Sequence, residues 1–292
     1  MRNVSLLFLV FILTACVPAQ APSPTPIVSV TNTATSNPTV APSPTIMPSP
    51  TPAPHGPCDN PLVPLAIGNQ WTYQVTSEDR ESQYTLKSLE RADGRNIVTI
   101  VELTAHNNGN SVREPVVCMD AAIEDFPLFM MDMLFANYLN DFFNTYHERG
   151  IYAPAHEVFV ENGWTMNWDA EYLTEDTAYI KNPLGASDLV ILESSPMDLY
   201  FEMDGTREAV TVPAGEFLQT LKVKHVFNLT VTLTLPTGGT GGLLTIYTTQ
   251  WYEPYVGLVR AQLDSASLRM GMQEFSVPME STLELVEFKA GD

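Results

Sequence analysis

The stretch Leu221-Lys222-Val223-Lys224-His225-Val226-Phe227-Asn228-Leu229-Thr230-Val231-Thr232-Leu233-Thr234-Leu235 decides the fold of this chain. Every second residue from Leu221 to Leu235 is apolar, with His225 as the one exception, and the residues between them are mostly polar. This alternation predicts a β-strand with one buried face and one face toward solvent. A strand of this length exceeds the usual run of about five or six residues, so we expect it to bend within a curved sheet.

The segments on either side of this strand predict more strands. Before it, Pro213 and Gly215 form a tight turn after a strand that begins near Ala209. After it, a glycine-rich turn at 236–242 leads into a hairpin and a meander. The further strands that we expect are 96–104, 189–192, 243–251, 258–267 and 279–288. The expected fold class is therefore all-β, a mainly antiparallel curved sheet or open half-barrel.

Two parts of the chain resemble each other at a constant offset. The segment 61–72 matches 154–165, with Trp71 opposite Trp164, and 111–117 resembles 205–211. The similarity predicts an internal duplication, with a first half at 58–120 and a second half at 151–292. Chance similarity between β-rich segments is the alternative.

Between these halves, residues 123–149 predict an inserted amphipathic α-helix. Apolar residues recur there every four positions: Met130, Leu134, Tyr138, Phe142 and Tyr146. Asp125 is suited to cap the start of this helix and Gly150 its end. We expect the helix to cover one face of the sheet. A lid over an apolar cavity and a helix on a membrane surface are the alternatives.

The first residues of the chain have the features of an export signal. Arg2 precedes an apolar run from Val4 to Leu13, which is too short to span a bilayer, and Leu13-Thr14-Ala15-Cys16 follows. This stretch resembles the bacterial lipoprotein signal family. The resemblance implies a signal peptide at 1–15, cleavage between Ala15 and Cys16, and a diacylglycerol on the Cys16 sulfur. An ordinary secretory signal with an incidental cysteine is the alternative.

Residues 16–57 predict a disordered stalk rich in proline, threonine and serine. No charged residue lies between Asn3 and Cys58, and 12 of the 23 prolines fall between Val17 and Pro57. Proline removes backbone donors, and few large side chains are available for burial, so neither helix nor sheet is expected. The stalk is a bare spacer or an O-glycosylated one. We expect it to hold a β-rich head, 58–292, away from a membrane to which Cys16 is anchored, at the cell surface or in the periplasm.

Charge and cysteine content limit the partners and the compartment. The 34 acidic residues outnumber the 14 basic ones, for a net charge of −20, so nucleic acid is a poor partner. Outside the cytoplasm, Cys58 and Cys118 are expected to form a disulfide that closes a loop of about 60 residues. Two free thiols or a metal pair are the alternatives. The sequence does not specify an oligomeric state.

Motifs of known chemistry are not found. The chain has no Gly-x-Ser-x-Gly and no His-Glu-x-x-His, and its acidic clusters do not match an EF-hand loop. We therefore predict no catalytic residue, no metal site and no cofactor, and we expect a protein that is not an enzyme.

Three short segments of the head resemble a broad group of bacterial exported proteins and lipoproteins. They are Gly68-Asn69-Gln70-Trp71-Thr72-Tyr73, Val212-Pro213-Ala214-Gly215-Glu216-Phe217 and Trp251-Tyr252-Glu253-Pro254-Tyr255-Val256-Gly257-Leu258-Val259. The group is similar in outline to open β-barrels of the lipoprotein-carrier type, which wrap a curved sheet around an apolar cavity. The resemblance implies that architecture and no activity. Tyr255 departs from the pattern, because a small residue is common there.

The leading functional hypothesis is a non-enzymatic module that binds an apolar ligand or lipid. The candidate ligand-binding residues are Phe135, Leu139, Phe142, Trp164, His225, Phe227, Trp251 and Tyr255. The first alternative is a cell-surface interaction or adhesion protein with a solid core and an acidic contact surface. The second is a hydrolase with a site made of carboxylates.

Overall fold

The computed structural model describes residues 58, 60–77, 80–93, 97–125, 133–135, 138, 145–181, 188–235 and 238–291. All of them fall within one compact unit, Ser43–Asp292. The predicted signal peptide, the Cys16 lipid site and the predicted stalk, apart from its boundary with Cys58, lie outside the described residues.

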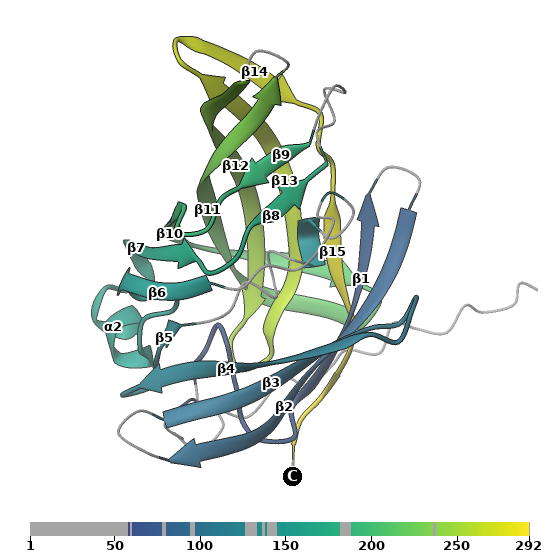
Figure 1. Cartoon of the computed structure of the whole chain (residues 1–292). Helices are drawn as coiled ribbons and strands as arrows, with labels where there is room; N and C mark the ends of the chain where they lie inside the picture. The colour runs from purple at the N-terminus through teal and green to yellow at the C-terminus, as the bar shows by residue number, and fades with distance from the viewer. Residues whose placement is uncertain are drawn as a thin grey trace, which may run out of the picture. The chain divides into compact units, whose positions relative to one another are not determined.

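The described residues form mainly antiparallel β-structure, which confirms the predicted fold class (Figure 1). In chain order the elements are β1 Gln70–Ser77, β2 Arg80–Asp93, β3 Ile97–Ala105, β4 Ser111–Met119, β5 Ala122–Asp125, β6 Thr145–Gly150, α2 His156–Glu161, β7 Thr165–Thr174, β8 Ala178–Ile180, β9 Leu189–Ile191, β10 Pro196–Val212, β11 Gly215–Leu235, β12 Gly238–Glu253, β13 Gly257–Met270, β14 Gln273–Val277 and β15 Thr282–Lys289.

One hydrogen-bonded path orders most of these strands as β5-β4-β3-β2-β1-β15-β13-β12-β11-β10-β7-β6. Ile123 in β5 and Ala153, just after β6, exchange two backbone hydrogen bonds of 2.8 and 3.1 Å. This bridge joins the two ends of the path, so the sheet nearly closes into a barrel. The side strands β8, β9 and β14 pair outside the main path.

The strand that was predicted from 221 to 235 is the second part of β11. Its alternation is confirmed, because Leu221, Val223, Phe227 and Leu229 are buried, whereas Lys222, Lys224, Val226 and Asn228 are not. Strand β11 is longer than predicted, and its pairing with β10 shifts register between Met203/Arg207 and between Glu208/Val210. Such irregularities bend a long strand, as a curved sheet requires.

The first and the last of the three segments that carry the resemblance meet in space. Trp71 Nε1 donates a hydrogen bond to the Val256 carbonyl, and Tyr73 Oη donates one of 3.1 Å to the Leu258 carbonyl. Both aromatic side chains are buried. The opening strand is thus fastened to the turn between β12 and β13, far along the chain.

The helix predicted over 123–149 is wrong at both ends. Ala122–Asp125 is strand β5 and Thr145–Gly150 is strand β6, whereas the central Met133–Phe135 is helical and most of the rest lies outside the described residues. Pairing of β6 with β7 outweighs the four-residue periodicity, which extends to Tyr146. Gly150 has a φ of +83° as expected, but it ends a strand, where a Cβ would collide with the Asp169 backbone.

At the offset that suggested a duplication, the first pair of matched segments differs in structure. Trp71 lies within strand β1, whereas Trp164 lies in a turn with a φ of +61°. A short helix, α2, precedes Trp164, and no helix precedes Trp71 in the described residues. The segments around Trp71 and Trp164 therefore take different local structures, whereas 111–117 and 205–211 both lie in strands, β4 and β10.

Candidate functional site

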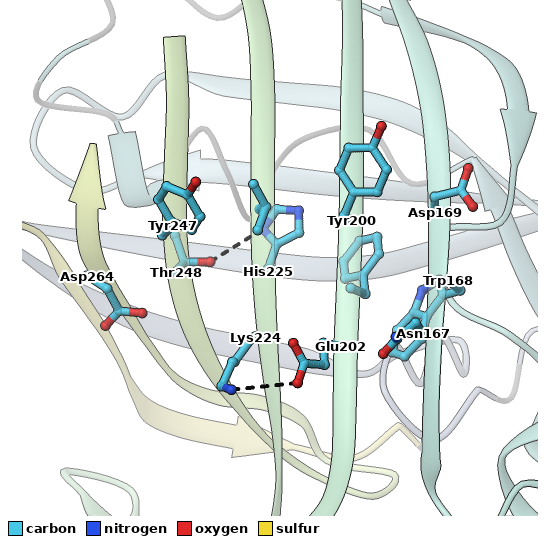
Figure 2. Close-up of a pocket in the computed structure, with 12 residues that line it drawn as sticks. Asn167, Trp168, Asp169, Tyr200, Glu202, Lys224, His225, Tyr247, Thr248 and Asp264 are labelled. Carbon is cyan, nitrogen blue, oxygen red and sulfur yellow. Dashed lines mark hydrogen bonds and ion pairs between the residues drawn. The ribbon is translucent and has the colours of Figure 1, made fainter. Parts of the chain in front are cut away.

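A groove of about 520 Å³ crosses strands β7, β10, β11 and β12 and reaches Asp264 of β13. Figure 2 shows two rows of side chains along it. The first row is Asp169, Tyr200, Val226 and Tyr247. The second row is Asn167, Glu202, Lys224 and Asp264.

Strand alternation and register build these rows. Tyr200 is paired with Asp169 on one side and with Val226 on the other, and Val226 is paired in turn with Tyr247. Residues one position away, such as Phe201 and His225, point to the opposite face of the sheet, because successive side chains alternate. Phe201 and His225 are buried, so the groove lies on the outer face of the barrel and their strands form its floor.

Two tyrosine rings form the most prominent walls of the groove. Tyr200 is 45% exposed and Tyr247 is 44% exposed, although both are large aromatic residues. They are separated by one strand, β11, which places them about 10 Å apart at the usual strand spacing. Val226 lies between them and gives the floor an apolar patch.

The charged side chains of the groove are mostly acidic. Lys224 Nζ lies 3.6 Å from Glu202 Oε1, and both side chains are more than half exposed. Asp264 Oδ2 accepts a hydrogen bond of 2.7 Å from Thr249 Oγ1. Asp169, Glu202 and Asp264 against Lys224 give three negative charges to one positive charge.

More acid lies next to the groove on the same face. Asp198 is paired across the strands with Glu171, and Arg149 contacts both Glu171 and Asp169. Burial, followed by the nearby charge of Glu171, raises the pKa of the Asp198 carboxyl above its ordinary value. The β7 end of the groove therefore carries more carboxyl groups than cations.

A hydrogen-bonded chain lies beneath the groove, inside the barrel. Tyr252 Oη donates to Gln250 Oε1 (2.6 Å), Gln250 Nε2 donates to Thr248 Oγ1 (3.4 Å), and Thr248 Oγ1 lies 3.3 Å from His225 Nδ1. Burial lowers the pKa of His225 to about 3. The ring also stacks on Phe201, with centroids 4.6 Å apart.

The part of the barrel interior next to segment 62–65 is closely packed. Segment 62–65 covers Trp71, Tyr73, Tyr152 and Tyr252 there, and about 20 Å³ remains between them. Burial raises the pKa of all three tyrosine hydroxyls. This part of the interior has no room for a lipid.

The candidate ligand-binding residues are only partly brought together. Phe135 and Phe227 are both buried, with ring centroids 6.3 Å apart. Leu139 and Phe142 lie outside the described residues. Trp251 lies on the outer face, where its Nε1 donates a hydrogen bond of 2.8 Å to Glu208.

Trp164 and Tyr255 meet through one histidine. The His156 ring lies 6.0 Å from Trp164 and 6.1 Å from Tyr255, and Tyr255 Oη is 3.1 Å from His156 Nδ1. Tyr255 has a φ of +63°, a backbone conformation that glycine adopts most readily.

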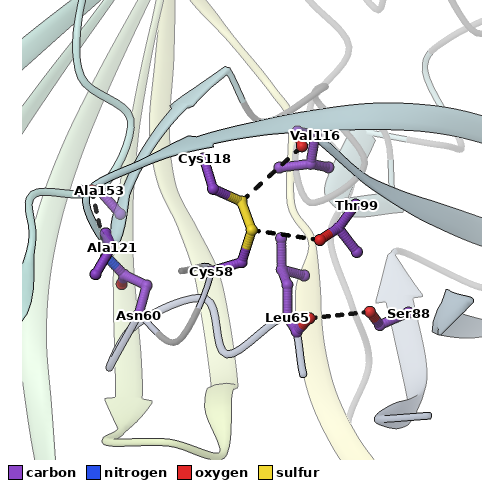
Figure 3. Close-up of a disulfide and its surroundings, with 9 residues drawn as sticks. All are labelled: Cys58, Asn60, Leu65, Ser88, Thr99, Val116, Cys118, Ala121 and Ala153. Atoms are coloured by element: carbon purple, nitrogen blue, oxygen red, sulfur yellow. Dashed lines mark hydrogen bonds between the residues drawn. A yellow bond between two sulfur atoms is a disulfide. The ribbon is translucent and has the colours of Figure 1, made fainter. Parts of the chain in front are cut away.

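The predicted disulfide between Cys58 and Cys118 is confirmed (Figure 3). Its Cα atoms are 5.4 Å apart, and it links the start of the head to β4. Beside it, the fully buried Asn60 donates to the carbonyl oxygens of Ala121, Ala153 and Pro154. Disulfide and asparagine together hold the segment before β1 against the junction where the barrel closes.

Within the described residues, no three or more His, Cys, Asp or Glu side chains are placed to hold a metal ion. None of the helices in the described part of the chain is both long enough and apolar enough to cross a membrane.

The groove residues were not identified from the sequence. The one available signal was an aromatic residue at a solvent-facing position of an alternating strand, such as Tyr200 between the buried Leu199 and Phe201. That signal does not say which strands are neighbours. The outer groove depends on the pairing of β10, β11 and β12, which the sequence pattern leaves open.

The fold and groove define a class: a nearly closed antiparallel β-barrel with a groove on its outer face. No protein-family model matches the chain, and no curated protein sequence matches it. A solved structure from Parabacteroides distasonis, described as a lipoprotein, has a TM-score of 0.50 and 16% identity, and the match covers 77% of this chain and 97% of that one. The shared feature is the fold.

A second solved structure, from Bacteroides fragilis, is described as an exported protein with a YmcC-like fold. It has a TM-score of 0.45 and 16% identity, and the match covers 79% of this chain and 98% of that one.

Proposed function

We propose that this chain is a lipid-anchored extracytoplasmic protein whose β head is a non-enzymatic binding module. The lipobox ending at Cys16 supports the anchor, and the description of the Parabacteroides distasonis protein as a lipoprotein is compatible with it. The Cys58–Cys118 disulfide suits an oxidising compartment outside the cytoplasm.

The binding site of this module is the groove between Tyr200 and Tyr247. The observation that carries the proposal is a groove of about 520 Å³ with two half-exposed aromatic walls. Its residues stand on paired strands of one sheet, so their spacing is set before a ligand arrives. A site built on strands in this way loses little conformational entropy on binding.

The ligand of this site is cationic. Three carboxylates line the groove against one lysine, and the chain has a net charge of −20. The faces of tyrosine rings also attract cations, because an aromatic ring is negative on its faces. Attraction by charge and by aromatic faces therefore acts in the same direction.

The geometry favours this outer groove over an apolar site inside the barrel. Near segment 62–65 the interior leaves about 20 Å³, and Phe135 occupies the space against Phe227. The groove also fits the alternative of a surface interaction protein, in which the acidic exterior makes the contact. It has the volume and the exposure that the packed region beside segment 62–65 lacks.

The proposal is tested with a fluorescently labelled oligolysine peptide and the purified head, by fluorescence anisotropy. We expect saturable binding that weakens as salt rises, because exposed charges are screened. Tyr200→Ala and Tyr247→Ala should each weaken binding about 2–5-fold, the equivalent of an exposed cation–π contact of about 0.5–1 kcal/mol.

Tyr179→Ala is the matched control. Tyr179 is 46% exposed, like the two groove tyrosines, but it lies on β8, away from the groove. If Tyr179→Ala weakens binding as much as Tyr200→Ala, or if the peptide does not bind, the groove is not the site.

A further inference from the structure

We infer that the groove takes a ligand with two cationic groups joined by an apolar middle. This inference rests on the proposed function, since it specifies the ligand of the same groove. It comes from the order of chemical groups along the groove, which is acidic and aromatic at each end and apolar in the centre.

The end at β7 is formed by Asp169 and Tyr200. These two residues are directly paired across β7 and β10, so the carboxylate and the ring stand side by side. Arg149 lies 3.4 Å from Asp169 but also contacts Glu171, and Asp198 is next to them. Three carboxylates against one guanidinium leave this end negative.

The end at β13 is formed by Asp264 and Tyr247. The pairing of β12 with β13 shifts register between Tyr247 and Thr248, where Tyr247 faces Ser265 and Thr248 faces Leu263. Asp264 is the extra residue at this bulge. A bulge redirects a side chain, and here the Asp264 carboxylate lines the groove (Figure 2).

The centre of the groove does not favour a cation. Val226 lies on β11 between the two tyrosines, and Lys224 stands two residues from it on the same face. Lys224 is 3.6 Å from Glu202, so this pair is neutral overall. A ligand amine at the centre would meet the Lys224 ammonium, whereas a methylene chain would lie on Val226 and between the tyrosine rings.

Strand spacing gives the distance between the two cationic groups. Tyr200 and Tyr247 are about 10 Å apart, and Asp169 and Asp264 are separated by four strand spacings, about 19 Å along the sheet. Each cation should lie near one tyrosine and one aspartate. The two charges of the ligand should therefore be about 10–19 Å apart.

The test is isothermal titration calorimetry of the head with linear α,ω-diamines, from diaminopropane to diaminododecane. Each diamine is compared with the monoamine of the same chain length, so the growth in apolar surface cancels. We expect the diamine to bind with higher affinity than its monoamine only in the longer members of the series. The excess should be about 2–5-fold, as for one added exposed cation–π contact.

Two variants locate the ends. Asp169→Asn and Asp264→Asn should each reduce the affinity of a long diamine to that of its monoamine and change the monoamine less than about twofold. Asp176→Asn, in an exposed turn away from the groove, is the control and should change neither affinity.

The outcomes separate this inference from the proposed function. If amines bind at the groove but diamines show no advantage at any length, the two-cation inference is wrong and the proposed function stands. If neither the amines nor the oligolysine peptide binds, both are wrong. An advantage that is largest for the shortest diamine would also overturn the inference, because both charges would then share one end.

Discussion

Replacing the buried His225 with phenylalanine should change how stability depends on pH. The imidazole is 2% exposed, and burial lowers its pKa to about 3, whereas an unfolded histidine titrates near 6.5. The unfolded chain therefore binds a proton at this position that the folded chain rejects. The neutral imidazole therefore makes its full contribution to the free energy of unfolding above about pH 6.5. This contribution is lost as the pH falls toward about 3.

The size of this effect follows from the shift in pKa. Lowering the His225 pKa by about 3.5 corresponds to about 4–5 kcal/mol in the free energy of unfolding, at 1.36 kcal/mol for each pKa unit, once the pH is below both values. At pH 5 the loss should be about 2 kcal/mol. A phenylalanine ring can still stack on Phe201, as His225 does, but it removes the hydrogen bond between Thr248 and His225 Nδ1. The variant should thus be less stable at pH 7.5 and should recover about 2 kcal/mol relative to the wild type at pH 5.

Urea unfolding followed by tryptophan fluorescence at pH 7.5 and pH 5 measures both free energies. The difference between variant and wild type cancels the titration of the many carboxylates common to both. His106→Phe, which removes an exposed histidine, gives the baseline. If the free-energy difference for His225→Phe is the same at both pH values, His225 does not have the buried, neutral state described above.

Three further results are expected. Cys58→Ser/Cys118→Ser should lower the free energy of unfolding by about 4 kcal/mol, from a closed loop of 60 residues, and the same loss should follow reduction of the wild type with dithiothreitol. Asn60→Ala should lower the free energy of unfolding in urea by about 2–4 kcal/mol, because three carbonyl groups and two backbone N–H groups lose a buried partner. Asn60→Asp should not recover this loss, because a carboxylate has no N–H group to donate to the three carbonyls. Asp198→Asn should stabilise the head by about 0.2–1 kcal/mol at neutral pH, because it removes the cost of burying the carboxylate and its repulsion with Glu171. This gain should vanish in acid, where Asp198 is protonated, and a gain that persists in acid would contradict both causes.

The strands were the most predictable part of the fold, because alternation is a local signal. The pattern from Leu221 to Leu235 predicted both the strand and its buried face, and the meander that follows it was confirmed as β12, β13 and β15. The length of β11 was underestimated, since its first residues lack strict alternation. Strand β14 was missed, and most of its residues are exposed.

The helix over 123–149 was wrong at its ends for a physical reason. Tyr146 continues an apolar four-residue spacing, but Thr145–Gly150 pairs with strand β7 between Ala170 and Thr174. Pairing with β7, together with the contacts of Arg149 to Glu171 and Asp169, favours an extended chain. A nonlocal partner of this kind is not visible in a local pattern.

The groove could not be predicted from the sequence, because it depends on register. Tyr200, Val226 and Tyr247 lie on three different strands and become neighbours only when β10, β11 and β12 pair as they do. Asp264 joins them through a bulge in β13. The candidate residues chosen from the sequence were apolar and aromatic side chains, such as Phe227, and several of these proved to be core.

The most direct test of the cationic groove is the affinity of Lys224→Met for the labelled oligolysine peptide. Lys224 is exposed and paired with Glu202, so its loss should affect stability little. If the ligand is cationic, removal of the groove's one lysine should tighten binding about 2–5-fold at low salt, with a smaller gain at high salt. Weaker binding by Lys224→Met would contradict the assignment of the groove to a cationic ligand.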